Sequence, residues 1–516
     1  SSEGAATGAG VTNIVLAGAY GNLAGKYLWK ALFSLYLEVD RSGTGDVIKI
    51  FAAGRDAPEK GWPKVEAFLN TRLECGDEHA KYKCTTQDIS NFRAALGGIE
   101  YVQLKKDEHY EAMCNQMSAS DLPERGRMFY LSVPPFAYAG MAKTIAEKCT
   151  SPNKDAFLRV AFEKPFGSDL ESAEVMAEQL AAHLKEDQIY RVDHYLGKRG
   201  VQQIMNYRLS TPAVDALLTK DYISSVRVIM TESESCAGRT SFYDEYGVVR
   251  DVHQNHLTEV LSLVGMDLKD ASDPVKALKA KADFLQSIED AQLEHAVLGQ
   301  YSGYLEHCRA DRNDNSYVTK TATFAAASLR VNDGRWAGVP ILIVAGKMLN
   351  ERAAYVEVEL KDLTKHYQSR AASKLTFHIQ GGTPKRGPEV RIGFDLAAHF
   401  AEKADHDATD YTEPPKDGWE HCDLNGLDQD VLESTAAVFS NGTASKPDLP
   451  YDRLMSAMYA GAQDLFVGTG GLMQSWRLWD RLLKQMDAPD SPEPFVYAPH
   501  STYREIVGFA AAESHR

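Results

Sequence analysis

The chain has 516 residues, of which 44% are hydrophobic and 25% charged, and a formal net charge of −16. This composition is typical of a soluble globular protein, and the length favours two domains. The negative charge argues against non-specific nucleic-acid binding, so an anionic ligand would need a local cluster of basic side chains. No apolar run approaches the ~20 residues that span a bilayer, so we expect no transmembrane helix.

The first predicted elements are a strand over residues 12–17 and a helix with apolar side chains at helical spacing from Leu23 to Leu35. Between them lies a turn with Gly18 and Gly21, where backbone amides at a helix N-terminus would bind a pyrophosphate. The spacing of these glycines departs from the full GxGxxG pattern, so the prediction of a nucleotide site rests on the position of the turn between a strand and a helix. The alternative is a tight structural turn.

A second strand is predicted over residues 47–53, and Arg55 and Asp56 follow it. Dehydrogenases that use NAD usually have an acid here, which holds the ribose hydroxyls, whereas an arginine suits the 2′-phosphate of NADP. Arg55 comes first and favours NADP, while Asp56 keeps NAD open.

Further strands are predicted over residues 128–133 and 158–162, with helical patterns between them. This alternation predicts a parallel, doubly wound α/β sheet of the Rossmann type. Lys164 follows the last strand at the edge where such sheets bind ligands, so it could reach both a cofactor and a sugar hydroxyl. Ser168 and Glu171 then predict a capping box for the next helix.

Residues 191–198 read Arg-Val-Asp-His-Tyr-Leu-Gly-Lys. They bring an acid, an imidazole, a phenol and an ammonium group together in one short stretch, namely Asp193, His194, Tyr195 and Lys198. Such a set can hold a phosphate or orient a catalytic base.

The second half is rich in short strands, predicted over residues 226–230, 322–326, 341–344, 355–360, 375–379 and 390–394. They favour a large, mainly antiparallel sheet in an α+β domain. Residues 403–430 are acidic and predict a surface excursion. The predicted organisation is a flexible lead-in (1–10), a dinucleotide-binding domain (11–198), a substrate and dimerisation domain (199–486) and a Pro-rich tail (487–516).

A helical pattern over residues 248–264 has histidines opposite its apolar face. An alcohol loses a proton as its hydride leaves, so a base with a pKa near neutrality is needed, and histidine fits this role. His253 and His256 could instead bind a metal, but no pattern supplies further ligands, so we expect none. Lys347 and Arg352 form a basic pair suited to an anion, although such pairs are often solvated loops.

The seven cysteines include no CxxC pair, which makes a zinc site an unfavoured interpretation. Cys75 and Cys84 lie in one polar loop. A disulfide there would imply an oxidising compartment, and two free thiols are equally compatible with the spacing.

Four motifs occur together along the chain: the octapeptide at 191–198, Glu-Lys-Pro-Phe-Gly at 163–167, Asp-Val-x-Gln-Asn-His at 251–256 and Gly-Lys-x-Leu-Asn-Glu-Arg at 346–352. In this order and separation they resemble the glucose-6-phosphate dehydrogenase family along nearly the whole chain. Other segments look most like the hexose-6-phosphate dehydrogenase branch of the endoplasmic reticulum, namely 26–29, 132–138, 240–247, the Cys75–Cys84 spacing and Cys149.

The resemblance implies oxidation of glucose 6-phosphate, or of related hexose 6-phosphates, at C1 to a 6-phosphogluconolactone with hydride transfer to NADP. It implies that His256 is the base and that Asp193 orients it. The implied substrate-binding residues are Lys164, His194, Tyr195, Lys198, Glu232, Asp251, Lys347 and Arg352. The implied cofactor-binding residues are Gly18, Ala19, Tyr20, Gly21, Asn22, Leu23, Arg55, Tyr138 and Lys164. A homodimer or homotetramer in the lumen of the endoplasmic reticulum is expected, with the cytoplasm as the alternative compartment.

Three departures from the family's pattern bear on these expectations. Tyr20, Asn22 and Gly25 replace a small hydroxyl residue, an acid and a lysine in the glycine turn, which could weaken the cofactor site or change its preference. The residues after Arg352 are not basic, so we do not expect a second, structural NADP. The chain ends at Arg516 without the lactonase domain of the endoplasmic-reticulum branch, so we expect no lactonase activity from it.

The sequence leaves two alternative functions open. A dehydrogenase of phosphate-free sugars or polyols can share the Glu-Lys-Pro turn, but the octapeptide argues against it. A catalytically weakened binding or structural subunit is motivated by Tyr20 and Asn22, whereas the intact set of His256, Asp193 and Lys198 favours an enzyme.

Overall fold

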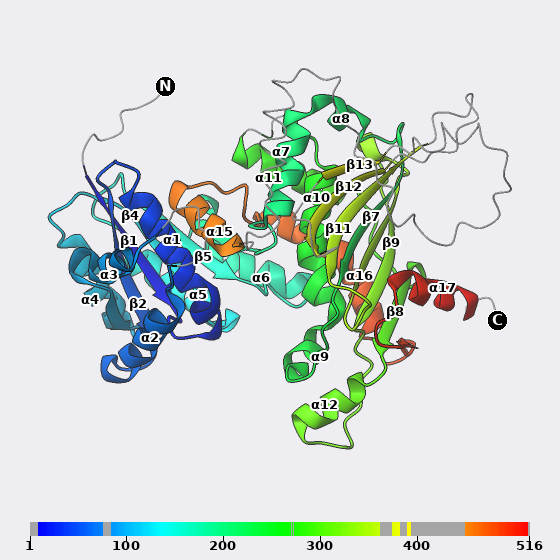
Figure 1. Cartoon of the computed structure of the whole chain (residues 1–516), viewed down its shortest axis with the longest axis horizontal. Helices are drawn as coiled ribbons and strands as arrows, with labels where there is room; N and C mark the ends of the chain where they lie inside the picture. The colour runs from blue at the N-terminus through cyan, green and yellow to red at the C-terminus, as the bar shows by residue number, and fades with distance from the viewer. Residues whose placement is uncertain are drawn as a thin grey trace. The chain divides into compact units, whose positions relative to one another are not determined.

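The structure is a computed structural model that describes residues 9–75, 84–269, 271, 273–361, 374–381, 390–393 and 449–513. The chain forms two compact units (Figure 1). Unit 1 comprises Ser1–Lys198, Asp270–Lys279 and Pro447–Met473, and unit 2 comprises Arg199–Lys269, Ala280–Lys446 and Gln474–Arg516. Most of the predicted lead-in and all of the predicted excursion at 403–430 lie outside the described residues. Among the described residues, no helix has the length and apolar character needed to cross a bilayer.

Unit 1 is built around a parallel sheet. Its strands are β1 (Val11–Ala17), β2 (Val47–Gly54), β3 (Glu100–Gln103), β4 (Glu124–Leu131), β5 (Phe157–Glu163) and β6 (Ile189–Val192). They lie in the order β3-β2-β1-β4-β5-β6, and every neighbouring pair is parallel. This order is that of doubly wound dinucleotide-binding folds, with the switch point between β1 and β4. The predicted Rossmann-like domain is confirmed.

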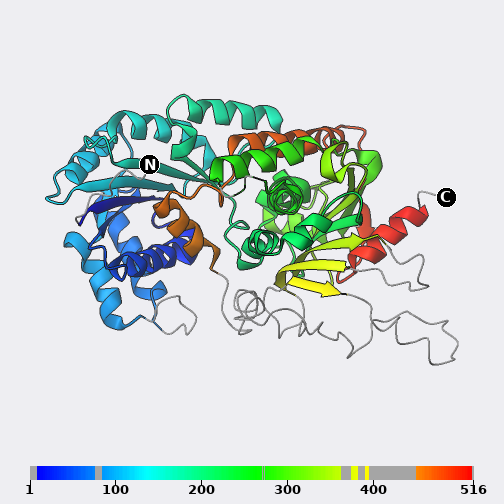
Figure 2. The same ribbon diagram turned by 90° about the horizontal axis from the view of Figure 1, so that it is seen from above.

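Helices cover both faces of this sheet (Figure 2). One layer contains α1 (Trp29–Asp40), α2 (Pro58–Arg72), α3 (Thr86–Ala94) and α15 (Pro450–Ala460), and the other contains α4 (Asp107–Ser118), α5 (Tyr138–Lys148) and α6 (Leu170–Ala181). Shorter helical segments are η1 (Ala24–Leu28), η2 (Ala95–Gly97), η3 (Pro135–Ala137) and η4 (Glu186–Gln188). The capping box of α6 uses Asp169 and Ser172, one residue later than the predicted Ser168 and Glu171, because the Asp169 carboxylate accepts from the Ser172 amide.

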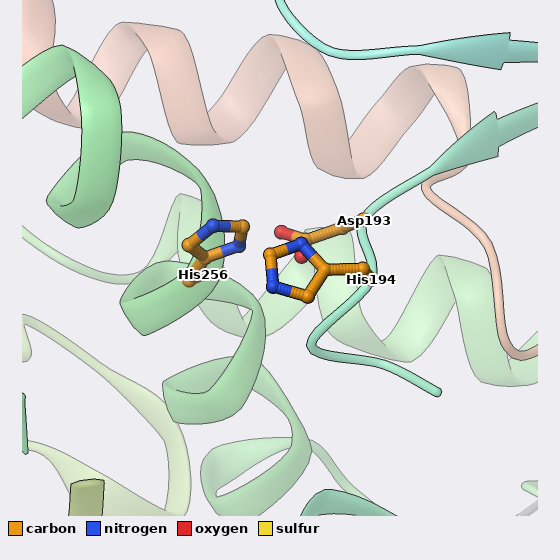
Figure 3. Close-up of side chains that lie close together, drawn as sticks. All are labelled: Asp193, His194 and His256. Carbon is orange, nitrogen blue, oxygen red and sulfur yellow. The ribbon is translucent and has the colours of Figure 1, made fainter. Parts of the chain in front are cut away.

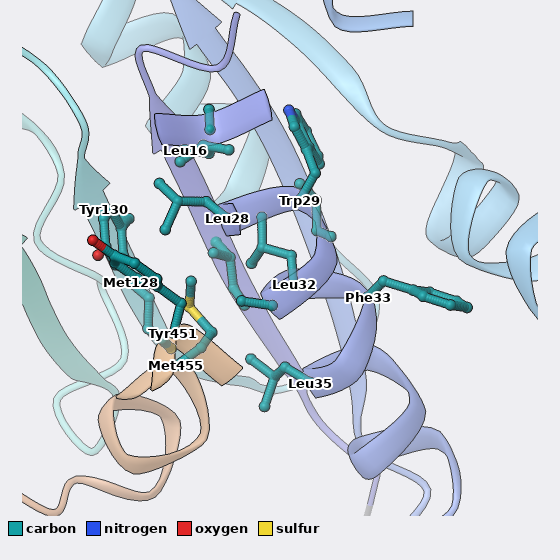
Figure 4. Packing of buried hydrophobic residues seen from close by; sticks show 14 of the residues in the cluster. Leu16, Leu28, Trp29, Leu32, Phe33, Leu35, Met128, Tyr130, Tyr451 and Met455 are labelled. Carbon is teal, nitrogen blue, oxygen red and sulfur yellow. The ribbon is translucent and has the colours of Figure 1, made fainter. Parts of the chain in front are cut away.

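The core of unit 1 joins two segments that are far apart in the sequence. Leu28, Trp29 and Leu32 belong to the same buried cluster as Leu16 of β1 and Met455 of α15 (Figure 4). Each of these side chains is at most 1% exposed, and burying one such side chain contributes roughly 1.5–3 kcal/mol. Helix α15 is therefore part of unit 1, although more than 250 residues separate it from β6.

Unit 2 is built around a second sheet. Its strands are β7 (Ile223–Thr231), β8 (Ala296–Tyr301), β9 (Phe324–Arg330), β10 (Pro340–Gly346), β11 (Ala353–Leu360), β12 (Lys374–Gly381), β13 (Val390–Gly393) and β14 (Phe495–Tyr497). They lie in the order β13-β12-β11-β7-β10-β9-β8-β14. Among the described strands of this sheet, the β7–β10 and β8–β14 pairs are parallel and the other neighbouring pairs are antiparallel, so the predicted mainly antiparallel sheet is confirmed.

The predicted helix over 248–264 differs from the observed one. The chain forms α9 (Thr240–Val248), then a π-helix, η5 (Val249–Leu257), then α10 (Thr258–Gly265). Gly247, with φ of 64°, interrupts the helical conformation within α9, one residue before its end at Val248. Segments of π-helix are rare and often occur at functional sites, and this one contains the candidate base His256.

The remaining helical segments are α7 (Arg199–Ser210), α8 (Pro212–Leu217), α11 (Pro274–Gln286), η6 (Leu293–His295), α12 (Tyr304–Arg312), η7 (Gly334–Trp336), α16 (Thr469–Met486) and α17 (Tyr503–Glu513). The segment predicted as a Pro-rich tail thus contains a strand, β14, and a helix, α17. The Tyr497 side chain of β14 is 2% exposed, and its hydroxyl donates to the Lys347 carbonyl over 2.7 Å. This C-terminal segment is therefore part of the core of unit 2.

Two disulfides lie in unit 1. Cys75 and Cys84 are bonded, with Cα atoms 5.3 Å apart, which settles the alternative that the sequence left open. Cys114 of α4 and Cys149, directly after α5, form a second disulfide that the sequence did not predict. Cys236 and Cys308 are free and buried, and Cys422 lies outside the described residues.

Candidate active site

The glycine turn after β1 brings three strand ends together. Gly18 has φ of 79°, and the amides of Gly18 and Ala19 both donate to the Ala53 carbonyl of β2, over 2.9 and 3.0 Å. A Cβ atom on Gly18 would lie 2.0 Å from the Ser132 carbonyl oxygen after β4. Glycine is therefore required here, and the turn leads directly into a helix that begins at Asn22. This geometry fits the pyrophosphate of a dinucleotide.

The other expected cofactor residues lie at neighbouring strand ends. Arg55 and Asn22 are exposed, and Tyr20 and Leu23 are half-buried. Tyr138 is 1% exposed, and its hydroxyl donates to the Glu163 carbonyl over 2.8 Å, so the structure places it in the interior beside β5.

Glu163, the last residue of β5, is surrounded by other ionisable groups, a feature that sequence reasoning missed. The Tyr130 hydroxyl donates to its carboxylate over 2.5 Å. Desolvation raises the pKa of Glu163 to about 7, and Asp193 adds to this effect, while Tyr130 and Lys164 oppose it. The half-buried Lys164 directly follows this carboxyl group. Glu163 is the acid of the Glu-Lys-Pro motif, and its place at the end of a predicted strand, directly before Lys164, was the signal that could have identified it.

The octapeptide forms a tight turn after β6. The Asp193 carboxylate accepts from the Tyr195 amide over 2.9 Å, and the Lys198 amide donates to the Tyr195 carbonyl over 2.9 Å. The Lys198 ammonium lies 4.6 Å from the centroid of the Tyr195 ring, and the His194 ring packs edge-on against the same ring at 5.2 Å. The turn therefore brings the predicted imidazole, phenol and ammonium groups together on one short loop.

Helix α15 supports this loop. The ring of Tyr451 stacks on His194 with centroids 6.1 Å apart and an interplanar angle of 9°. Arg453 donates to the Gly197 carbonyl over 2.6 Å. Both are sequence-distant contacts, and no local pattern in the sequence pointed to them.

The candidate base lies on η5 in unit 2. His256 is 3% exposed, and its amide donates to the Asn255 side-chain oxygen over 2.7 Å. Asp251 is half-buried on the same segment. His253 is fully buried, and its ring packs edge-on against Trp479 with centroids 5.2 Å apart. Figure 3 shows Asp193 and His194 on the loop after β6 and His256 on η5.

The remaining predicted substrate residues flank three strands of unit 2: Glu232 follows β7, Lys347 follows β10 and Arg352 precedes β11. Lys347 forms an ion pair with Glu232, and the amide of Glu232 donates to the Gly346 carbonyl over 3.0 Å. Arg352 is exposed and pairs with Glu234 at 3.2 Å. The two predicted cations therefore have different carboxylate partners, and the structure does not show them as one basic pair.

Two family models match this chain. The model of the glucose-6-phosphate dehydrogenase NAD binding domain matches residues 15–203, and that of the glucose-6-phosphate dehydrogenase C-terminal domain matches residues 205–506. The second match alone covers more than half of the chain.

Individual relatives agree with these matches. A human protein, the GDH/6PGL endoplasmic bifunctional protein, is 35% identical over 497 residues, which cover 92% of this chain and 59% of the human protein. The chain thus spans less than two thirds of that relative. The cytoplasmic glucose-6-phosphate 1-dehydrogenase 6 of Arabidopsis thaliana is 34% identical over 490 residues, covering 93% of this chain and 86% of the plant protein.

Similarity in structure extends over the same length. A solved structure of glucose-6-phosphate dehydrogenase in complex with its substrate glucose-6-phosphate has a TM-score of 0.75 and 26% identity, covering 98% of each chain. The family models, the plant relative and this fold lead to one conclusion: the chain belongs to the glucose-6-phosphate dehydrogenase family.

Proposed function

We propose that this protein oxidises glucose 6-phosphate, and related hexose 6-phosphates, at C1 to a 6-phosphogluconolactone. The observation that carries the proposal is the turn after β6, which gathers His194, Tyr195 and Lys198 around one loop. Such a cluster of donors suits a phosphate dianion, and binding at this remote group positions C1 for reaction. The family relatives named as glucose-6-phosphate dehydrogenases support the same substrate class.

His256 acts as the general base that takes the proton from the C1 hydroxyl. Asp193 orients His256 and stabilises its protonated form, a role that an acid commonly has beside a catalytic histidine. Glu232 and Asp251 accept hydrogen bonds from sugar hydroxyls, and Lys164 bridges sugar and cofactor. Lys347 and Arg352 add positive charge for the phosphate, in competition with their carboxylate partners.

The nicotinamide cofactor accepts the hydride from C1. NADP is the proposed cofactor because Arg55 is exposed directly after β2, where a 2′-phosphate would be held. The turn from Gly18 to Leu23, with Arg55, Tyr138 and Lys164, forms the proposed binding site.

The lumen of the endoplasmic reticulum is the proposed compartment. Two disulfides in unit 1 and the similarity to the human endoplasmic protein support it, because disulfides persist in oxidising compartments. A homodimer or homotetramer is proposed as the assembly, with the sheet of unit 2 at the interface, and light scattering at several protein concentrations measures its mass.

Initial rates of nucleotide reduction test the proposed reaction. Glucose 6-phosphate should be oxidised with NADP⁺ at a rate far above that of free glucose at equal concentration. Comparable rates with both sugars would favour a dehydrogenase of unphosphorylated sugars. No reduction with either NADP⁺ or NAD⁺ would favour a binding subunit.

A further inference from the structure

The end of β2 carries both residue types that distinguish NAD-binding from NADP-binding sheets. Arg55 is exposed and Asp56 is half-buried, directly after the strand. An acid at this place accepts hydrogen bonds from the ribose hydroxyls of NAD, whereas a cation there suits a 2′-phosphate. The contacts of Asp56 decide between these two possibilities.

One side chain already pairs with the Asp56 carboxylate: Lys64 of α2 donates to it over 2.7 Å. The Tyr20 hydroxyl is a further, smaller cause that lowers the pKa of Asp56. The hydrogen bond from Lys64 is the largest of the causes that lower the pKa of Asp56, so the group stays anionic and paired. A carboxylate paired in this way has less capacity to accept ribose hydroxyls, and its negative charge is compensated.

Aromatic rings hold this pair in position. The rings of Tyr20 and Tyr101 stack with centroids 6.5 Å apart, and the Lys64 ammonium lies 4.7 Å from the centroid of the Tyr20 ring. The Tyr101 hydroxyl donates to the backbone oxygen of Asp56 over 3.0 Å. A Cβ atom on Gly54 would lie 2.4 Å from the Tyr20 ring, so this ring packs directly on the end of β2. The tyrosine that departs from the family's glycine turn is thus part of the Asp56 cluster.

The charges around Asp56 favour an anionic ligand. Lys60 and Lys64 both interact electrostatically with its carboxylate, and Arg55 adjoins it in the chain. We propose that Lys64 is a specificity-determining residue, which screens Asp56 and, together with Arg55, selects an adenosine ribose with a 2′-phosphate over one without it. This inference rests on the proposed function, because it concerns the same cofactor site.

Calorimetric binding of two cofactor fragments tests the inference without relying on catalysis. Adenosine 2′,5′-bisphosphate carries the 2′-phosphate, and 5′-AMP lacks it. The variants are Lys64→Gln, Asp56→Asn and the double variant, with Lys143→Gln as the matched control, since Lys143 is an exposed lysine of unit 1 on α5. Thermal unfolding checks that each variant is folded, which is expected because Lys64 has a 54% exposed side chain.

In Lys64→Gln the affinity for the bisphosphate should fall about tenfold, while that for 5′-AMP changes less than about twofold. The double variant should regain most of the lost affinity for the bisphosphate, because the Asp56 carboxylate, which repels the 2′-phosphate once Lys64 is replaced, is then absent as well. Equal losses for both ligands, or the same loss in Lys143→Gln, would overturn the inference. If the fragments behave as expected but glucose 6-phosphate is not oxidised, the proposed reaction fails and the role of Lys64 stands. If oxidation occurs and Lys64→Gln leaves fragment binding unchanged, the reaction stands and the role of Lys64 fails.

Discussion

Protonation of His253 should make unit 2 sensitive to acid. The ring is fully buried, packs on Trp479, and has its Nδ1 atom 3.4 Å from the Val248 carbonyl oxygen. Burial lowers the pKa of His253 from 6.5 to about 4, so the folded protein keeps this histidine neutral. In the unfolded chain the same group binds a proton below pH 6.5, and this favours unfolding as the pH falls.

The size of the effect follows from the two pKa values. A pKa difference of one unit corresponds to about 1.4 kcal/mol, so His253 withdraws about 2 kcal/mol of stability between pH 8 and pH 5. The loss of stability begins near pH 6.5, the pKa of His253 in the unfolded chain, and is complete below its pKa of about 4 in the folded protein. A His253→Gln variant should be less stable at both pH values, because a well-packed ring is lost. The loss of its free energy of unfolding between pH 8 and pH 5 should, however, be about 2 kcal/mol smaller than that of the unaltered protein.

Urea unfolding followed by tryptophan fluorescence measures this difference, because Trp479 contacts the ring. His295→Gln is the matched control, since the side chain of His295 is 58% exposed, and its pH dependence should equal that of the unaltered protein. An unchanged decrease in stability between pH 8 and pH 5 for His253→Gln would refute the reasoning.

Two further predictions concern a disulfide and the octapeptide. Replacing Cys114 by Ser should lower the free energy of unfolding by about 4 kcal/mol, because the bond to Cys149 closes a loop of 35 residues. Thermal unfolding measures this difference. A variant as stable as the unaltered protein would contradict the prediction. Replacing Lys198 by Ala should raise KM for glucose 6-phosphate at least about tenfold and leave KM for NADP unchanged, because its ammonium lies beside Tyr195 in the loop proposed to bind the phosphate. A rise in KM for the nucleotide alone would assign Lys198 to the other ligand.

Local pattern was sufficient to predict the elements that position the cofactor. The apolar run before Gly18 and the strand before Arg55 lie where they were expected, because alternating strands and helices have few ways to pack. The strands of unit 2 were also predicted, but β8 and β14 were not. β14 is three residues long beside several prolines, and it is a strand because it pairs with β8. β8 and β14 are far apart in the sequence, so no local sequence pattern could predict this pairing.

The candidate site shows the same limit. The octapeptide identified His194, Tyr195 and Lys198, which share one turn. The stacking of Tyr451 on His194 could not be predicted, because α15 lies some 250 residues further along the chain. The π-helix around His256 was predicted as an ordinary helix, since both have apolar residues at similar spacing. Tyr20 was predicted to weaken the cofactor site or to change its preference, and its contact with Lys64, the partner of Asp56, depends on the fold.

The most direct test of the proposed reaction is the behaviour of His256→Asn with glucose 6-phosphate. Turnover with NADP⁺ should fall about a thousandfold, because the proposed proton acceptor is removed. The calorimetric affinity for glucose 6-phosphate should change less than about threefold, because the loop proposed to bind the phosphate, with Tyr195 and Lys198, is unaltered. Turnover close to that of the unaltered protein would contradict the assignment of His256 as the base.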